Sequence, residues 1–164
     1  MTTVTETTRH SVSVSAVVVD EEDRVLLIRR HDNGEWQSPG GILELDEDIH
    51  AGVRREVLEE TGYSVEPQRL TGVYKNMPLG VVALVFLCQV LSGDARPSEE
   101  TSDVAWVPLL DVQSRMTEAF AVRVLDAITL TDHVAIRAHD GYRIIHPPAT
   151  EVGDFGQKSS RFPL

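Results

Sequence analysis

Alternating polar and apolar residues mark the first strand that the chain is expected to form. Residues 11–16 read Ser-Val-Ser-Val-Ser-Ala, and the chain is then continuously apolar over 17–19. This pattern predicts a strand that has one buried face at its start and becomes fully buried at its end. Residues 20–23 are polar and predict a turn, and residues 24–30, RVLLIRR, predict a second strand. The two strands are therefore expected to form a hairpin.

Further strands are predicted in the middle of the chain and toward its end. Residues 65–75 have strand character interrupted by a proline, and residues 104–107 form a short apolar stretch after a polar, acidic connector. Residues 81–91, VVALVFLCQVL, are almost entirely apolar, which is typical of a strand buried on both faces, so this segment is predicted to be the central strand. Residues 138–145 are expected to form a terminal hairpin or strand.

Two segments have helical spacing. In residues 117–130 the apolar positions repeat with the period of an amphipathic helix, at Phe120, Val124, Ala127 and Ile128. The other predicted helix buries a strip made by Ile49, Val53 and Val57. Gly62 suits the left-handed position that ends a helix.

The first predicted helix carries an acidic triplet. Glu56, Glu59 and Glu60 stand at i, i+3 and i+4, so they project from one wedge at the margin of the buried strip. Like charges at this spacing repel, and a divalent cation would turn the repulsion into binding, because Mg²⁺ takes oxygen ligands from carboxylates and substrate phosphates. The alternative interpretation is a solvated acidic face.

Composition narrows the classes of function. The chain has 164 residues, enough for one domain, and a formal charge of −11, which argues against a long nucleic-acid footprint. A small phosphorylated ligand stays compatible if a metal ion supplies local positive charge. The sequence shows neither a secretory signal pattern nor a long apolar span, so we expect a cytoplasmic protein without membrane contact. Cys88 is the single cysteine and is predicted to be a core residue.

The segment from Gly41 to Tyr63 resembles the complete Nudix box of the Nudix hydrolase family. The matching positions are Gly41, Glu47, Arg55, Glu56, Val57, Glu59, Glu60, Gly62 and Tyr63. Two common preferences of the family are absent, since Asp46 stands where glycine is frequent and Gly52 where alanine is frequent. The resemblance implies a Nudix-type α/β/α sandwich, and strands alternating with two helices independently fit a mixed β-sheet between helices.

The same resemblance implies the chemistry of the site. Mg²⁺ or Mn²⁺ is expected to bind Glu56, Glu59 and Glu60, together with the backbone carbonyl of Gly41. Arg55 is expected to orient the glutamates. One of these glutamates, or Glu100, would accept the proton of the attacking water.

Acidic residues of the box loop have two assignments each. Glu47 is a candidate metal ligand or a structural partner of Arg55. Asp46 is expected to cap the helix, with Asp48 as the alternative cap.

Other residues are candidates for contact with the substrate. Arg30, at the end of a strand, is a candidate for phosphate or base contact, and the alternative is a solvent-facing arginine. Trp36 could stack a ring or instead cover the core. Pro78 lies fifteen residues after Tyr63, close to where relatives that act on ADP-ribose often have a proline, although a turn proline is equally compatible. The alternative interpretation of Glu100 is a residue of a solvated loop.

Together these features predict a small domain and a hydrolase. Residues 1–10 are expected to be a flexible N-terminus, 11–146 the Nudix domain and 147–164 an irregular tail. The predicted reaction is cleavage of a pyrophosphate linkage in a nucleotide-type substrate, with an ADP-ribose-like compound first and a nucleoside triphosphate second. The alternatives are a nucleotide sensor without catalysis and an isomerase of prenyl diphosphates. Relatives commonly form homodimers, so a homodimer is a candidate assembly.

Overall fold

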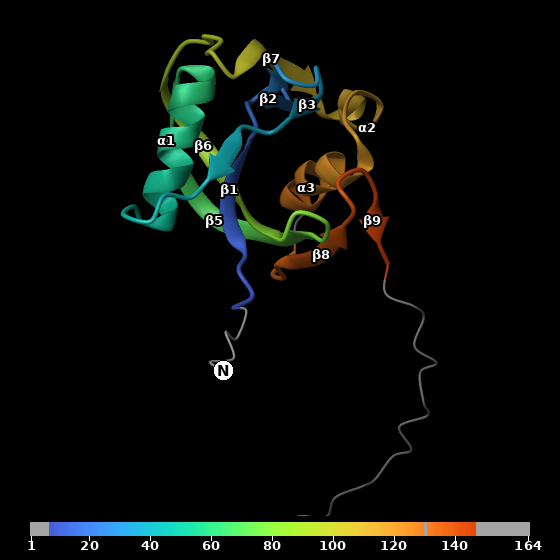
Figure 1. Cartoon of the computed structure of the whole chain (residues 1–164). Helices are drawn as coiled ribbons and strands as arrows, with labels where there is room; N and C mark the ends of the chain where they lie inside the picture. Colours follow the sequence, from blue (N-terminus) through green and yellow to red (C-terminus); the bar gives the residue numbers. More distant parts are fainter. Residues whose placement is uncertain (1–6, 130, 147–164) are drawn as a thin grey trace, which may run out of the picture.

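The computed structural model describes residues 7–129 and 131–146 (Figure 1). Residues 7–10 have no regular secondary structure. The remainder of the expected N-terminal segment, residues 1–6, and the expected tail, residues 147–164, lie outside the described residues. Within the described ranges, no helix has the length and apolar character that crossing a membrane requires.

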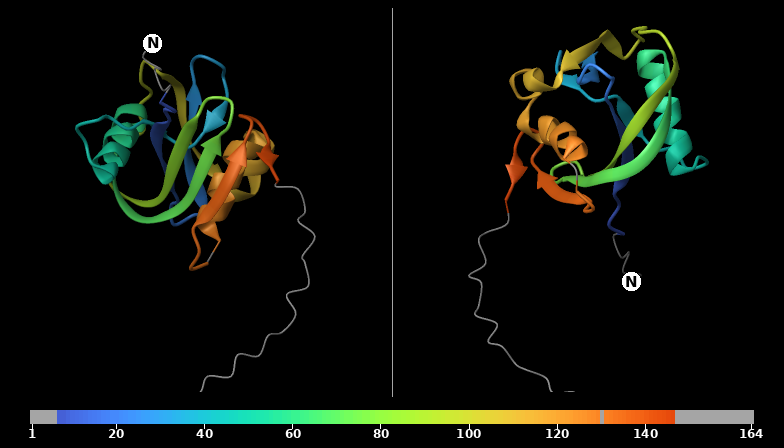
Figure 2. Two further views of the ribbon diagram at one scale, coloured as in Figure 1. Left: turned by 60° about the horizontal axis from the view of Figure 1, so that its bottom comes forward. Right: turned by 180° about the vertical axis from the view of Figure 1, so that it is seen from behind.

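A six-stranded mixed sheet forms the centre of the molecule. Its strands follow the order β4 (Gly40–Ile42), β1 (Ser11–Val18), β6 (Val81–Gly93), β5 (Tyr63–Asn76), β8 (Ala135–His139) and β9 (Ile144–Ile145). β6 pairs in parallel with β1 and antiparallel with β5, so it is an inner strand, as predicted from its apolar sequence. β8 and β9 form the predicted terminal hairpin, which lies beside α3 (Figure 2).

The expected hairpin of the first two strands is wrong. β1 and β2 (Arg24–Arg30) do not pair along their length, and Val19, just after β1, forms an isolated antiparallel bridge with Val25. Both edges of β1 are occupied, one by β6 and the other by β4, so β2 has no free edge of β1 to pair with. β2 instead lies between β3 (Trp36–Gln37) and β7 (Thr101–Pro108) in a separate antiparallel sheet of three strands.

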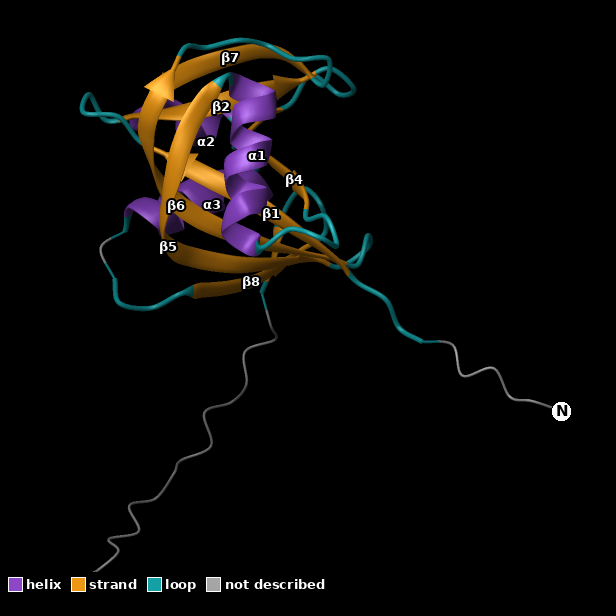
Figure 3. Ribbon diagram, turned by 90° about the vertical axis from the view of Figure 1, so that its left-hand side faces the viewer, coloured by secondary structure: helices purple, strands orange, loops and turns teal. Residues whose placement is uncertain are grey.

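Helices cover both faces of the mixed sheet. α1 (Ile49–Thr61) lies in front of β5 and β6 in Figure 3, and α3 (Glu118–Ile128) is seen behind these strands. A 3-10 turn (Leu109–Asp111) and the short α2 (Val112–Arg115) connect β7 to α3. This arrangement confirms the predicted α/β/α sandwich with a mixed sheet, to which the structure adds the second sheet.

Alternation along the strands divides the apolar residues between two cores. In β2, Val25 and Leu27 pack in the core that contains α3, whereas Leu26 packs in the core beneath α1. Successive side chains of a strand point to opposite faces, so a strand buried on both sides supplies both cores. Cys88 is 3% exposed in the core beneath α1, which confirms it as a core residue.

The ends of α1 fix where its acidic residues lie. Asp48 caps the helix, and its carboxylate accepts a hydrogen bond from the backbone N–H of Ala51 at 2.8 Å. The expectation that Asp46 is the cap is therefore wrong, because Asp46 lies two residues before the cap position, too far from the first free N–H groups of the helix. Gly62 adopts the predicted left-handed conformation, with φ of 82°.

Candidate active site

The buried side of α1 carries two of its three acidic residues. Glu56 and Glu60 are 8% and 4% exposed, whereas Glu59 is exposed. The apolar strip beside them consists of Val53 and Val57, which are almost fully buried, while Ile49 at the start of the helix is 40% exposed, contrary to its predicted burial. Two carboxylates are thus held partly out of water at the edge of the core, where an uncompensated charge is costly.

Arg55 is the centre of a network that ties the box loop to α1. Its guanidinium donates two hydrogen bonds to the carboxylate of Glu47, at 2.6 and 2.8 Å. It also donates to Glu56 at 2.8 Å, to Glu59 at 3.2 Å and to the backbone carbonyl of Ile42 at 3.2 Å. These bonds lower the pKa of Glu47 to about 2 and raise the pKa of Arg55. Arg55 therefore stays charged and orients three carboxylates.

Glu60 has a different environment from the other acids of the helix. One oxygen of its carboxylate accepts a hydrogen bond from the backbone N–H of Gly40 at 2.8 Å. Burial raises the pKa of Glu60 to about 8, and the nearby charges of Glu56 and Glu100 act in the same direction. Burial also raises the pKa of Glu56, although its bond to Arg55 opposes the shift.

The backbone of Gly41 lies directly against the carboxylate of Glu56. A Cβ atom added at Gly41 would stand 2.5 Å from Glu56 Oε1, which is closer than real Cβ contacts allow. Glycine at this position therefore lets the strand β4 approach the acidic side of α1 without displacing the Glu56 carboxylate.

An open cleft of about 750 Å³ gathers the acidic groups of the loop, of α1 and of the segment before β7. Its lining contains five carboxylates and a single guanidinium, from Glu44, Asp46, Glu56, Glu59, Glu100 and Arg55. Glu100 reaches the cleft because its carbonyl accepts a hydrogen bond from the backbone N–H of His31 at 3.0 Å, which fastens the loop to the end of β2. Excess negative charge of this kind suits a cation.

The donors of this cleft fit a hard divalent cation by their chemistry. Carboxylate oxygens are the ligands that Mg²⁺ and Mn²⁺ prefer. Among the described residues, no three carboxylate, imidazole or thiol groups converge on one point. Arg55 draws Glu56 and Glu59 toward itself, and Glu60 turns toward Gly40, so gathering the three requires side-chain rotation.

The three residues predicted to contact the substrate lie in two different environments. Arg30 forms an ion pair with Asp32 at 2.6 Å and lines, together with Pro78, an outer pocket of about 450 Å³. Trp36 packs against the core that contains α3, and the guanidinium of Arg115 lies 5.9 Å from its ring centroid. Pro78 and Arg30 are thus brought together, while Trp36 lines none of the pockets named here.

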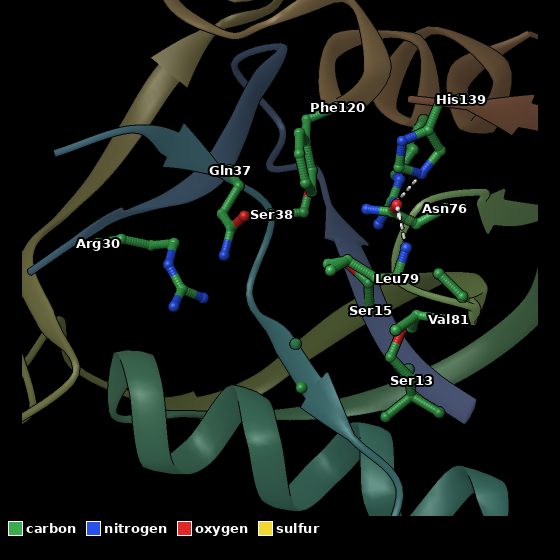
Figure 4. A pocket seen from close by; sticks show the side chains of 15 residues that line it. Ser13, Ser15, Arg30, Gln37, Ser38, Asn76, Leu79, Val81, Phe120 and His139 are labelled. Atoms are coloured by element: carbon green, nitrogen blue, oxygen red, sulfur yellow. Dashed lines mark hydrogen bonds between the residues drawn. The ribbon is translucent and has the colours of Figure 1, made fainter. Parts of the chain in front are cut away.

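An inner pocket contains residues that the sequence did not single out. It shares Arg30, Gln37 and Phe120 with the outer pocket and extends inward to Arg123 of α3 and His139 of β8 (Figure 4). The available signal was helical spacing, since position 123 falls on the same apolar stripe as Phe120 and Ala127. An arginine within such a stripe indicates a buried charge.

The chain is similar to known proteins that contain one kind of domain. The model of the NUDIX domain matches residues 9–128. A "MutT-like protein" of Streptomyces ambofaciens is 53% identical over 137 residues, which are 83% of this chain and 88% of that protein. An "ADP-ribose pyrophosphatase" of Methanocaldococcus jannaschii is 30% identical over 99 residues, covering 56% of this chain and 59% of that protein.

A solved structure agrees with the fold. The crystal structure of an ADP-ribose pyrophosphatase from Streptococcus suis has a TM-score of 0.66 and 28% identity, and the match covers 80% of this chain and 100% of that one. The chain therefore belongs to the Nudix family and is a hydrolase of that family.

Proposed function

We propose that the chain is a metal-dependent hydrolase that cleaves a pyrophosphate linkage in a nucleoside diphosphate derivative. The observation that carries the proposal is the acidic cleft, in which five carboxylates face one guanidinium beside the backbone of Gly41. A pyrophosphate is an anion, so a site this acidic can bind it only together with cations. This requirement joins the carboxylates, the metal ion and the phosphate substrate in one function.

Several residues in and beside the cleft have roles in this proposal. Glu56, Glu59 and Glu60, with the carbonyl of Gly41, would hold Mg²⁺ or Mn²⁺. When bound, the ion would neutralise phosphate oxygens and make a nearby water more acidic. Arg55 keeps the carboxylates oriented through its five hydrogen bonds and is a positioning residue.

The proton of the attacking water needs an acceptor on the protein. Glu100 faces the cleft from the opposite segment and is one candidate. The other candidates are the glutamates of α1, and among these Glu59 is the most exposed and therefore the least costly to keep ionised.

The substrate that we favour is ADP-ribose-like. Arg30 and Pro78 line one outer pocket, where the arginine can contact phosphate. Two of the similar proteins, from M. jannaschii and S. suis, are named ADP-ribose pyrophosphatases. A nucleoside triphosphate is the second candidate.

The isomerase interpretation has little support. The Cys88 thiol is buried in the core beneath α1, and burial raises its pKa to about 12. A thiol with such a high pKa is a poor acid or nucleophile near neutral pH.

The test is hydrolysis of a substrate panel by the wild-type protein and by Glu60→Gln. The panel contains ADP-ribose, nucleotide sugars, dinucleotide polyphosphates and deoxynucleoside triphosphates, each with Mg²⁺ or Mn²⁺. Glutamine has the shape of a protonated glutamate and can still accept the hydrogen bond of Gly40, so the fold should persist. We expect the variant to lose at least about 100-fold in kcat.

The control is Glu21→Gln, which alters an exposed glutamate in the turn between β1 and β2. It should match the wild type on every substrate. Binding of a panel member without cleavage under either metal would replace the hydrolase with the nucleotide sensor. Unchanged turnover by Glu60→Gln would remove the metal role from the triplet.

A further inference from the structure

The inner pocket has the opposite charge to the acidic cleft. Its volume is about 170 Å³, and its lining includes Arg30 and Arg123 but no aspartate or glutamate. The chain as a whole has 26 acidic residues against 15 lysines and arginines. Asp32, which does not line this pocket, already pairs with Arg30 at 2.6 Å. The charge that needs an explanation is therefore that of Arg123.

Arg123 is the most unusual of these residues because it is a buried cation. It is 7% exposed, and its Nε has no hydrogen-bond partner among the described residues. Two aromatic rings flank the guanidinium, with its carbon 4.6 Å from the centroid of Phe120 and 5.2 Å from that of Tyr74. Burial lowers the pKa of Arg123 to about 10, so the side chain is still charged at neutral pH. The rings stabilise a cation in part but do not neutralise it.

The acid nearest along the helix does not compensate this charge. Asp126 lies one turn after Arg123, but its carboxylate accepts two hydrogen bonds from Arg137, at 2.7 and 2.8 Å. It also accepts one from the hydroxyl of Tyr74 at 2.7 Å. Within the described part of the chain, Arg123 forms no ion pair with any carboxylate.

His139 does not compensate the charge either. Its Nε2 lies 3.2 Å from Nη2 of Arg123, and its Nδ1 lies 3.1 Å from the backbone nitrogen of Gly141. In one neutral tautomer Nε2 accepts a hydrogen bond from Nη2 of Arg123, and in the other Nδ1 accepts from Gly141 while the proton on Nε2 faces the guanidinium. Neither tautomer supplies a negative charge. A protonated ring would add a second positive charge. In each state the positive charge remains unbalanced.

The pocket also offers polar atoms and a limited volume. The Oγ of Ser38 is buried, lines the pocket and has no hydrogen-bond partner among the described residues. A cavity of about 150 Å³ is large enough for benzene. The inner pocket therefore has room for one small group, whereas a whole nucleotide would have to extend into the outer pocket.

We propose that the inner pocket is a binding site for one small anionic group, a phosphate or a carboxylate, held by Arg123 and Ser38. An anion supplies the charge that the buried guanidinium lacks and acceptors for both unpartnered atoms. A neutral base edge would supply only acceptors. This inference rests on the proposed function and narrows it: among nucleoside diphosphate derivatives, it favours those that carry an anionic group outside the cleaved linkage, which ADP-ribose itself lacks.

The first experiment measures anion binding apart from catalysis. Inorganic phosphate and, separately, acetate are titrated into the whole protein by calorimetry, with a chelator present and at low ionic strength. We expect saturable binding of at least one anion, and the stronger of the two identifies phosphate or carboxylate as the group. Arg123→Met should weaken it roughly 10- to 100-fold, as expected for loss of a hydrogen-bonded charge.

The control is Arg115→Met, which removes an exposed arginine that lies against Trp36 outside the pocket. It should bind the anion as the wild type does. Arg123→Lys is included in case the methionine variant fails to fold, and it should bind the anion more weakly than the wild type but measurably. Equal binding by wild type and either Arg123 variant would overturn the proposal, as would absence of saturable binding to the wild type.

A second experiment connects the pocket to the substrate. Nucleoside diphosphate sugars are compared with the corresponding uronic acids, which differ by one carboxylate. We expect KM to be at least tenfold lower for the uronic acids, and this preference to shrink in Arg123→Lys. Glu60→Gln should abolish turnover of both series of substrates but bind inorganic phosphate as the wild type does. A failure of the hydrolase proposal and a failure of this inference therefore give different results. Equal KM values for the two series would contradict the link to substrate.

Discussion

Replacing Arg55 by lysine tests whether the guanidinium positions the acidic cleft. The arginine donates five hydrogen bonds to three carboxylates and one carbonyl. A lysine ammonium has three donors on one atom, so at least two of the five contacts are lost while the charge is kept. The variant therefore separates geometry from electrostatics.

The expected loss follows from the number of contacts. A hydrogen bond to a charged group contributes roughly 1.5–3 kcal/mol, and we reduce this because the Arg55 side chain is 24% exposed. Two lost contacts then amount to about 2 kcal/mol, which corresponds to a decrease in Tm of about 4–8 °C for a chain of this length. Displaced carboxylates should lower kcat by about 100-fold.

The assay compares thermal unfolding and kcat with those of Arg54→Lys. Arg54 is the preceding residue on α1, and it forms an ion pair with Glu66 in which the two side chains are 43% and 45% exposed. Exposed pairs contribute little to stability, so this variant should keep the Tm and kcat of the wild type. If the two variants lose kcat equally, or if Arg55→Lys retains full activity, the positioning role of Arg55 is refuted.

Three further changes test separate features. Gly41→Ala places a Cβ against the carboxylate of Glu56, which can move aside. We therefore expect a Tm near that of the wild type but a kcat about 100-fold lower. A large decrease in Tm together with the loss of kcat would point to misfolding instead. The pKa of His139 is lowered by burial below its ordinary value of 6.5, so stability should be fully present above pH 6.5 and decrease as the pH falls through the folded pKa. His139→Asn should flatten that decrease in denaturant unfolding, and an unchanged pH profile would contradict the assignment. Cys88→Ala should leave hydrolysis intact, whereas a loss of activity in a folded variant would revive the cysteine-dependent isomerase.

Comparison of the expected and observed strands shows the limit of local patterns. The strand segments themselves follow from apolar runs, and the run over 81–91 correctly indicated an inner strand. The pairing of β1 did not follow, because adjacency in sequence favours a hairpin while the edges of β1 are taken by β4 and β6. Strand order is a competition between distant segments that no local window contains.

The acidic site was largely determined by the sequence, since helical spacing alone sets Glu56, Glu59 and Glu60 on one wedge. What only the tertiary structure decided is how these residues differ. Glu60 is buried beneath Gly40, and Glu59 remains in solvent. Glu100 reaches the same cleft from a loop that is distant in sequence. Their charges depend on the surrounding dielectric and partners, which exist only after packing.

The inner pocket depends still more on tertiary structure. Spacing in the sequence indicates that Arg123 lies on the buried stripe of a helix, and it says nothing about which groups face the side chain. Packing commits Asp126 to Arg137 and Tyr74, and it brings His139 from a distant strand against the guanidinium. The sequence thus determined the elements and the acidic chemistry. The arrangement of charges between cleft and pocket was decided by contacts between segments far apart in the chain.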